Sequence, residues 1–150
     1  MVRVMRIIPA VLAALVLAAG AAADVVVVPL TVRPGTLSLA PATAIARQAH
    51  VGVTVVDARG KGAGWQLLAR AAVSGGMRTI VQGVELRCAP RSTCTLPQTK
   101  LRYPVVLDPL RPTVVFQAEA GTGMGAIGLT LKLAGPVLGW TALRFVVRPS

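Results

Sequence analysis

Glycine and proline recur at short intervals along most of this chain, and this punctuation constrains the fold more than any other feature. Proline breaks helices longer than about three turns, and the segments between the turn residues are short and rich in β-branched side chains. Short strands at this spacing are typical of an all-β sandwich or barrel, so we predict a β-sandwich-like domain. The predicted strands span residues 25–28, 51–56, 79–86, 101–107, 113–118, 127–133 and 141–147.

Two segments compete with this all-β interpretation. Residues 40–49 and 67–73 are rich in good helix formers (Ala, Leu, Arg and Gln), and propensity alone predicts a short helix in either. From Trp65 to Val73, however, alternate positions form a period-two pattern. That period favours a strand, so we predict a strand in the second segment.

The N-terminal segment has the parts of a secretory signal peptide. Arg3 and Arg6 form a basic region, residues 7–17 form an apolar region interrupted by one proline, and residues 21–23 are alanines suited to cleavage. We predict cleavage before Asp24 and hence a secreted protein. The alternative is an uncleaved N-terminal anchor, although the apolar run is at the short limit for crossing a bilayer.

Residues 1–23 are therefore assigned to the signal peptide, and residues 24–150 to one β domain. The mature part is long enough to bury a core without metal ions, and it has no second apolar segment of membrane-spanning length. Neither a lipobox cysteine nor a sortase-type signal is found in the sequence. Attachment to a surface is therefore expected to be noncovalent.

Cys88 and Cys94 enclose five residues. In an exported protein, a close and even pair of cysteines indicates a disulfide, worth about 2–3 kcal/mol for so short a loop. A zinc half-site would need two more Cys or His ligands, whereas His50 is the one histidine of the chain. A redox pair usually has two intervening residues. We predict a structural disulfide over these two alternatives.

The mature chain is strongly basic. Two of the 16 basic residues lie in the signal peptide, which leaves 14 against five acidic residues and a net charge of +9. Outside the cell, the abundant anionic partners are wall polymers and lipid headgroups; the alternative is a basic surface that serves solubility alone. The basic residues are spread singly and aromatic residues are few, so we expect no nucleic-acid partner.

Residues 57–67 join a β-branched run to a second apolar run through a glycine-rich loop. Asp57 opens the turn, where its carboxylate can accept backbone N–H groups, and the glycines permit positive φ and close approach of backbones. Trp65 and Leu67 then return on a common face. One interpretation is a hairpin with an ordinary core tryptophan, and the other is a structural corner of a binding domain; the two are compatible.

This corner resembles the first signature of the WxL domain, a cell-surface, cell-wall-binding family of Gram-positive bacteria. The family's DxRG…GWxL pattern is matched by Asp57, Arg59, Gly60, Gly64, Trp65 and Leu67. Residues 88–97 look like the disulfide loop of actinobacterial members, and residues 118–125 are similar to their AxxGTGMG segment. The resemblance covers most of residues 30–148. It implies peptidoglycan as a ligand and, in some systems, a partner surface protein.

The chain departs from the family pattern near its C-terminus. The family's second signature places a tyrosine-bearing strand before a tryptophan or aliphatic strand. Residues 134–143 contain no tyrosine, and the spacing there is Trp140-x-x-Leu143. The resemblance therefore carries less weight for wall binding through this end.

Motifs for catalysis and cofactors are weak in this sequence. Residues 123–128 match the letters of a dinucleotide fingerprint, but a strand-like alternation follows where a helix should begin. His50 is the one imidazole base, and no serine lies in a nucleophile-elbow context. The carboxylates that glycan hydrolysis would pair are scattered: Asp57, Glu85, Asp108 and Glu119. We predict a protein that is not an enzyme and needs no cofactor, nucleotide or metal.

The sequence thus favours a secreted β protein that associates noncovalently with the cell wall through peptidoglycan or anionic wall polymers. Arg59 and Lys61, in a loop expected to be exposed, are the candidate wall contacts. The alternative is a non-catalytic subunit of a surface complex that binds another protein through an apolar face or by strand addition. Residues 141–147 are the candidate edge strand for that addition.

Overall fold

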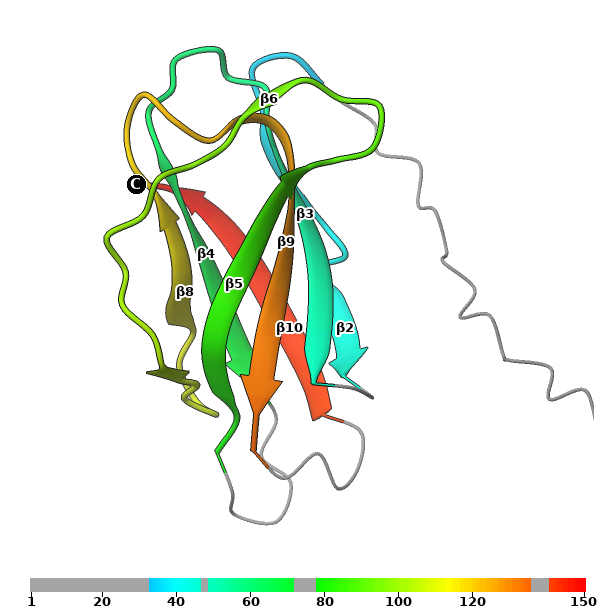
Figure 1. Cartoon of the computed structure of the whole chain (residues 1–150), viewed down its shortest axis with the longest axis vertical. Coiled ribbons are helices and arrows are strands. Elements are labelled where there is room, and N and C mark those ends of the chain that lie inside the picture. The colour runs from blue at the N-terminus through cyan, green and yellow to red at the C-terminus, as the bar shows by residue number, and fades with distance from the viewer. Residues whose placement is uncertain (1–32, 47–48, 72–77, 136–140) are drawn as a thin grey trace, which may run out of the picture.

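The computed structural model describes residues 33–46, 49–71, 78–135 and 141–150, and within these ranges every regular element is a β-strand. The strands form two antiparallel sheets whose inner faces share one core (Figure 1). The predicted all-β, sandwich-like fold is therefore confirmed. The predicted signal peptide and the predicted strand at 25–28 lie outside the described residues.

The first sheet is built around its long central strand, β9, which pairs with β3 on one side and β5 on the other. A short sixth strand, β6, pairs with the beginning of β9. In order across the sheet, the strands are β1 (Leu37–Ala40), β3 (His50–Asp57), β9 (Met124–Ala134), β5 (Ile80–Cys88) and β7 (Val105–Val106), with β6 (Cys94–Thr95) off this path.

The second sheet has four strands, and the last strand of the chain lies inside it. β10 pairs with β4 from Leu143 to Pro149 and with β2 from Thr141 to Arg144. In order across the sheet, the strands are β2 (Thr43–Ala46), β10 (Thr141–Pro149), β4 (Trp65–Ala71) and β8 (Thr113–Ala118).

Successive long strands alternate between the two sheets. The chain passes from β3 in the first sheet to β4 in the second, and it makes the same exchange from β5 to β8 and from β9 to β10. The two short strands β1 and β2 also belong to different sheets. In the segment that joins them, the Ala42 carbonyl accepts the Phe145 N–H at 2.8 Å. Long strands that follow one another in the described chain therefore belong to different sheets and do not pair as hairpins.

The core lies between the sheets and is formed by alternate residues of each strand, as the period-two pattern requires. Val51, Val53 and Val55 of β3 face Trp65, Leu67 and other inward residues of the opposite sheet. Burial of each such aliphatic side chain contributes about 1.5–3 kcal/mol. The other fully or nearly buried core residues include Phe116, Ile127, Leu129, Leu131, Leu143 and Phe145.

Most strands predicted from the sequence are present, and the strand interpretation of residues 67–73 is met by β4. The short helix that propensity alone predicts within residues 40–49 is wrong, because residues 43–46 pair with β10 as β2 and tertiary pairing outweighs local propensity. Of residues 101–107, two form β7. Among the described residues, the structure contains no helix long and apolar enough to cross a membrane.

Candidate functional site at the loop end of the sandwich

The loop between β3 and β4, which we call the glycine corner (residues 57–65), begins with a buried carboxylate. Asp57 is 3% exposed. Its Oδ1 accepts the backbone N–H of Arg59 at 3.1 Å and the Arg59 Nε–H at 2.9 Å, and its Oδ2 accepts a terminal guanidinium N–H at 2.8 Å. The side-chain hydrogen bond from Arg59 lowers the pKa of Asp57 from its usual value, against the opposing effect of burial. Asp57 is therefore a charged structural anchor.

Arg59 is committed to the same corner. Besides pairing with Asp57, its guanidinium donates to the Gly64 carbonyl at 2.7 Å and so ties the two ends of the loop together. The Arg59 side chain is 15% exposed, which differs from the exposed contact expected from the sequence, because the side chain folds back onto its own loop. Lys61, the other candidate contact, is exposed.

The corner needs glycine at its close approaches. Gly64 has a φ of +76°, and a β-carbon there would lie 2.6 Å from Ser150 Oγ and 2.7 Å from the Ala118 carbonyl oxygen. Gly123, in the facing loop, has a φ of +72° and leaves room for the Trp65 indole, since its β-carbon would meet Trp65 Nε1 at 2.9 Å. At both positions, a side chain would oppose the backbone conformation and the packing.

Trp65 belongs to the core. Its side chain is fully buried, its ring centroid lies 5.4 Å from that of Phe116, and its Nε1–H donates to the Gly123 carbonyl at 2.8 Å. A buried indole usually has such a partner for its N–H. Trp65 therefore joins the glycine corner to the loop before β9 and has no surface to offer a ligand in this structure.

The three segments on which the family resemblance rests come together at this end of the molecule. Gly121 N–H donates to the Gly62 carbonyl at 2.6 Å, which joins the 118–125 segment to the glycine corner. Gly123 N–H donates to the Thr95 carbonyl at 3.0 Å, which joins the same segment to the cysteine loop. Figure 1 shows the loops from β3 to β4, before β9, and around β6 at one end of the sandwich. We call this region the loop end.

The predicted disulfide is confirmed: Cys88 and Cys94 are bonded, with Cα atoms 5.6 Å apart. Cys88 ends β5 and Cys94 begins β6, and both strands pair with β9, opposite Ile127 and Gly125 respectively. The bond therefore holds the cysteine loop against the strand that leaves the 118–125 segment.

The C-terminal strand differs from its expected role. β10 lies between β2 and β4, so residues 141–147 form an interior strand and not the edge proposed for strand addition. Leu143, the last residue of the Trp-x-x-Leu spacing, is fully buried. Trp140 lies outside the described residues.

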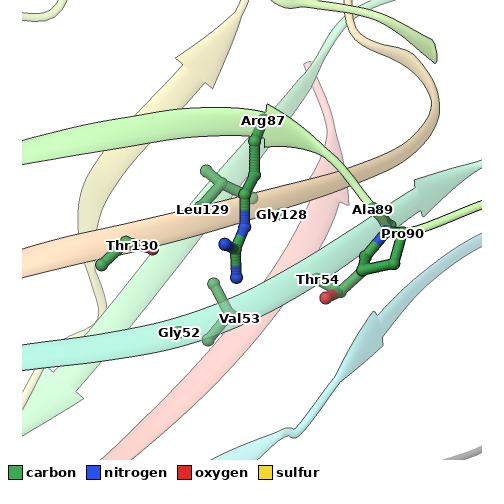
Figure 2. Close-up of a pocket in the computed structure, with 9 residues that line it drawn as sticks. All are labelled: Gly52, Val53, Thr54, Arg87, Ala89, Pro90, Gly128, Leu129 and Thr130. Carbon is green, nitrogen blue, oxygen red and sulfur yellow. The ribbon is translucent and has the colours of Figure 1, made fainter.

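A shallow recess of about 80 Å³ lies on the outer face of the first sheet (Figure 2). Gly52 and Gly128 leave its floor without side chains, while Thr54 and Thr130 flank it. Arg87 reaches from β5 across β9 above Gly128, as Figure 2 shows. The recess has room for an ion or a few waters, and a single cation faces it.

Among the described residues, the carboxylates lie apart from one another, although His50 is the cross-strand partner of Lys132, which pairs with Glu85. His50 begins β3, and the described carboxylates lie on separate parts of the fold: Asp57 at the end of β3, Glu85 on β5, Asp108 after β7 and Glu119 after β8. Within the described ranges, no three His, Cys, Asp or Glu side chains gather as metal ligands would. Glu85 and Glu119 pair with Lys132 and Lys100.

Sequence reasoning missed the contacts that assemble the loop end. Thr122 Oγ1 accepts the Gln98 N–H at 3.1 Å, and Ser150 Oγ donates to the Ala63 carbonyl at 3.2 Å. Single polar residues in loops carry no pattern, so the sequence held no signal for these pairings.

Comparisons of the chain with protein-family models, with curated proteins and with solved structures found no match in any of the three.

Proposed function

We propose that this protein is exported and associates noncovalently with the bacterial cell wall, through peptidoglycan or through the anionic polymers attached to it. The proposal starts from the resemblance of three segments to the WxL domain. The function proposed is binding without catalysis, in keeping with the scattered carboxylates of the sequence.

The observation that carries the proposal is the meeting of those three segments. Residues 57–67, 88–97 and 118–125 are separated by long stretches of chain, yet two backbone hydrogen bonds and the Trp65 indole link them at the loop end. Chance matches of short motifs would have no reason to fall together in space. Their contact supports the idea that they form one structural unit of the kind the resemblance implies.

The charge of the chain supports the same proposal. Residues 24–150 carry a net charge of +9, which attracts anionic polymers outside the cell and weakens with added salt. At the loop end, Lys61 is the candidate contact, because Arg59 is held by Asp57 and Gly64.

Co-sedimentation with purified peptidoglycan sacculi tests the proposal. The mature chain, residues 24–150, is mixed with sacculi before and after removal of the attached anionic polymers, each at low and high salt. Binding to untreated sacculi is the expected result. Lys61→Gln is expected to weaken it, with Lys100→Gln, at an exposed lysine between β6 and β7, as the control.

The outcomes separate the two ligands. Binding that survives polymer removal and salt identifies peptidoglycan itself, whereas binding lost with either treatment identifies the anionic polymers. No binding under any of these conditions would sink the proposal and would direct attention to a protein partner.

A further inference from the structure

The outer face of the second sheet carries an unusual set of charges. Along β4 and β10, the buried residues alternate with outward ones, and Arg70, Arg144 and Arg148 occupy outward positions. We call this surface the arginine face. Leu68 also points outward but is 6% exposed, so its neighbours on the face cover it.

Strand register places two of these arginines side by side. Arg144 of β10 is the direct cross-strand partner of Arg70 of β4, which brings their Cα atoms to roughly 4.5–5.5 Å. Like charges directly opposite each other destabilise an antiparallel pair. The register thus allows the two guanidinium groups to converge on one anion, which would relieve any repulsion between them.

No carboxylate of the described residues pairs with either arginine. The four strands of the second sheet contain no acidic residue. Asp57 is taken by Arg59, Glu85 by Lys132 and Glu119 by Lys100, while Asp108 accepts backbone N–H groups in its own turn. Within the described part of the chain, none of the three arginines forms an ion pair. A surface that serves only solubility would intersperse both signs.

The third arginine extends the charge along the strand. Arg148 lies four residues after Arg144 on the same face of β10, roughly 13 Å away at about 3.3 Å per residue. Its Nε–H donates to Gln66 Oε1 at 3.0 Å, which orients the guanidinium and leaves its terminal nitrogens for an external acceptor. The arrangement is a row of positive charge on a flat surface.

This geometry fits an extended polyanion better than a membrane. Guanidinium groups bind phosphate oxygens in bidentate fashion, and a row fits acidic groups repeated along one chain. The outward residues of β4 and β10 in the described structure include no aromatic anchor for a bilayer interface, and Val146, 54% exposed, is the one large apolar side chain that is open to solvent there.

We propose that the arginine face binds a linear, phosphate-bearing polymer, with phosphates seated at the Arg70–Arg144 pair and at Arg148. This inference rests on the proposed wall association and deepens it, since it names the polymer class and moves its main contact from the loop end to the second sheet. Relief of the repulsion between Arg70 and Arg144 contributes to binding.

The test measures the affinity of the mature chain for purified poly(glycerol phosphate) by titration calorimetry at low salt. The triple variant Arg70→Gln, Arg144→Gln, Arg148→Gln is compared with a control that removes the same charge at exposed arginines elsewhere: Arg33→Gln, Arg102→Gln, Arg111→Gln. We expect the first triple to bind about tenfold more weakly or worse, given the strength of charge-assisted hydrogen bonds. The control should bind within about threefold of the unmodified chain.

Equal loss in both triples would overturn the inference, because it would mean that net charge alone drives adhesion. Stronger binding to phosphatidylglycerol vesicles than to the polymer, with the same dependence on the three arginines, would also overturn it in favour of a membrane. The two proposals can fail separately. Binding of the arginine-face triple to polymer-free sacculi measures wall association through peptidoglycan, whereas its binding to poly(glycerol phosphate) measures the role of the arginine face.

A stability measurement distinguishes a binding role of Arg144 from a role in stabilising the second sheet. If the pair is held for an anion, Arg144→Gln should raise the urea midpoint of the free protein at low salt while it weakens polymer binding. A lowered midpoint together with weaker binding would show that Arg144 acts by supporting the sheet, and would count against the assigned role.

Discussion

At the scale of single residues, the glycine corner depends on backbone conformations that only glycine adopts easily. Gly60 and Gly64 both have positive φ, at 70° and 76°. They differ in their surroundings: a β-carbon at Gly60 would meet open space, whereas one at Gly64 would collide with Ser150 and Ala118. The two positions therefore separate the cost of conformation from the cost of packing.

We expect Gly64→Ala to destabilise the fold more than Gly60→Ala. The left-handed conformation alone costs about 1–2 kcal/mol for a non-glycine residue, and the collision adds about 1–3 kcal/mol of overpacking at Gly64. Urea denaturation of the two variants measures the difference. Equal losses would mean that the corner opens freely and that its contacts with the C-terminus contribute little.

Asp57 gives the corner a pH dependence. Because its pKa is lowered in the folded protein, the stability contributed by its charge is present above the ordinary pKa of an aspartate and is lost as the pH falls through the folded value. Asp57→Asn should therefore cost about 2–3 kcal/mol near neutral pH, where Arg59 loses its charged partner. The cost should shrink in acid.

Asp108→Asn is the control for Asp57→Asn. Asp108 accepts backbone N–H groups in an exposed turn, and the oxygen of an asparagine can still accept them. Its effect on the urea midpoint at neutral pH should be smaller. A loss at Asp57 that stays constant from neutral pH to about pH 2 would contradict the assigned role of its charge.

At the scale of elements, β8 is an edge strand that the chain itself protects. Tyr103 O–H donates to the Val115 carbonyl at 2.7 Å, at the irregularity in the pairing of β8 with β4. The segment between β6 and β8 thereby covers part of an edge that would otherwise be open to strand addition. Burial raises the pKa of Tyr103 to about 12.

Tyr103 is the single tyrosine of the chain, so its titration can be followed by the ultraviolet absorbance of tyrosinate. We expect a midpoint of about 12 in the folded protein and about 10 in urea. Because the folded pKa is raised, its contribution to stability is complete below the unfolded pKa and is lost as the pH rises toward 12. A folded midpoint of about 10 would mean that the hydroxyl is not held against β8.

Some strands could be predicted from the sequence and others could not. Short β-rich runs between turn residues located β3, β5, β8, β9 and β10, and period-two alternation decided for a strand at β4. β1 and β2 were missed, since each is four residues long and gains its order from partners far away in the sequence. The interior place of β10 was missed for the same reason: a strand's sequence does not reveal how many neighbours it has.

At the scale of the whole molecule, the exchange of successive long strands between the sheets explains why the candidate sites were only partly foreseen. The sequence located the glycine corner, the disulfide and Trp65, because each is a local pattern. The convergence of three loops and the pairing of Arg70 with Arg144 depend on strand order and register. Local composition does not determine either.

Strand order also separates two regions of different construction. The loop end is closed by backbone hydrogen bonds, a buried indole and the Asp57–Arg59 pair, which suits a rigid structural unit. The arginine face lies on the outer surface of the second sheet and is built from rigid strands. A protein of this form can present a fixed charged surface to a polymer outside the cell without opening its core.

The central claim, noncovalent association with the cell wall after export, is tested most directly by intact-mass measurement on the wall fraction of a Gram-positive host that expresses the full chain. We predict that high salt or, for protein bound to peptidoglycan itself, urea releases from that fraction a protein that begins at Asp24 and carries the mass of two oxidised cysteines. Retention of residues 1–23, or recovery of the protein from the cytoplasm alone, would contradict the claim.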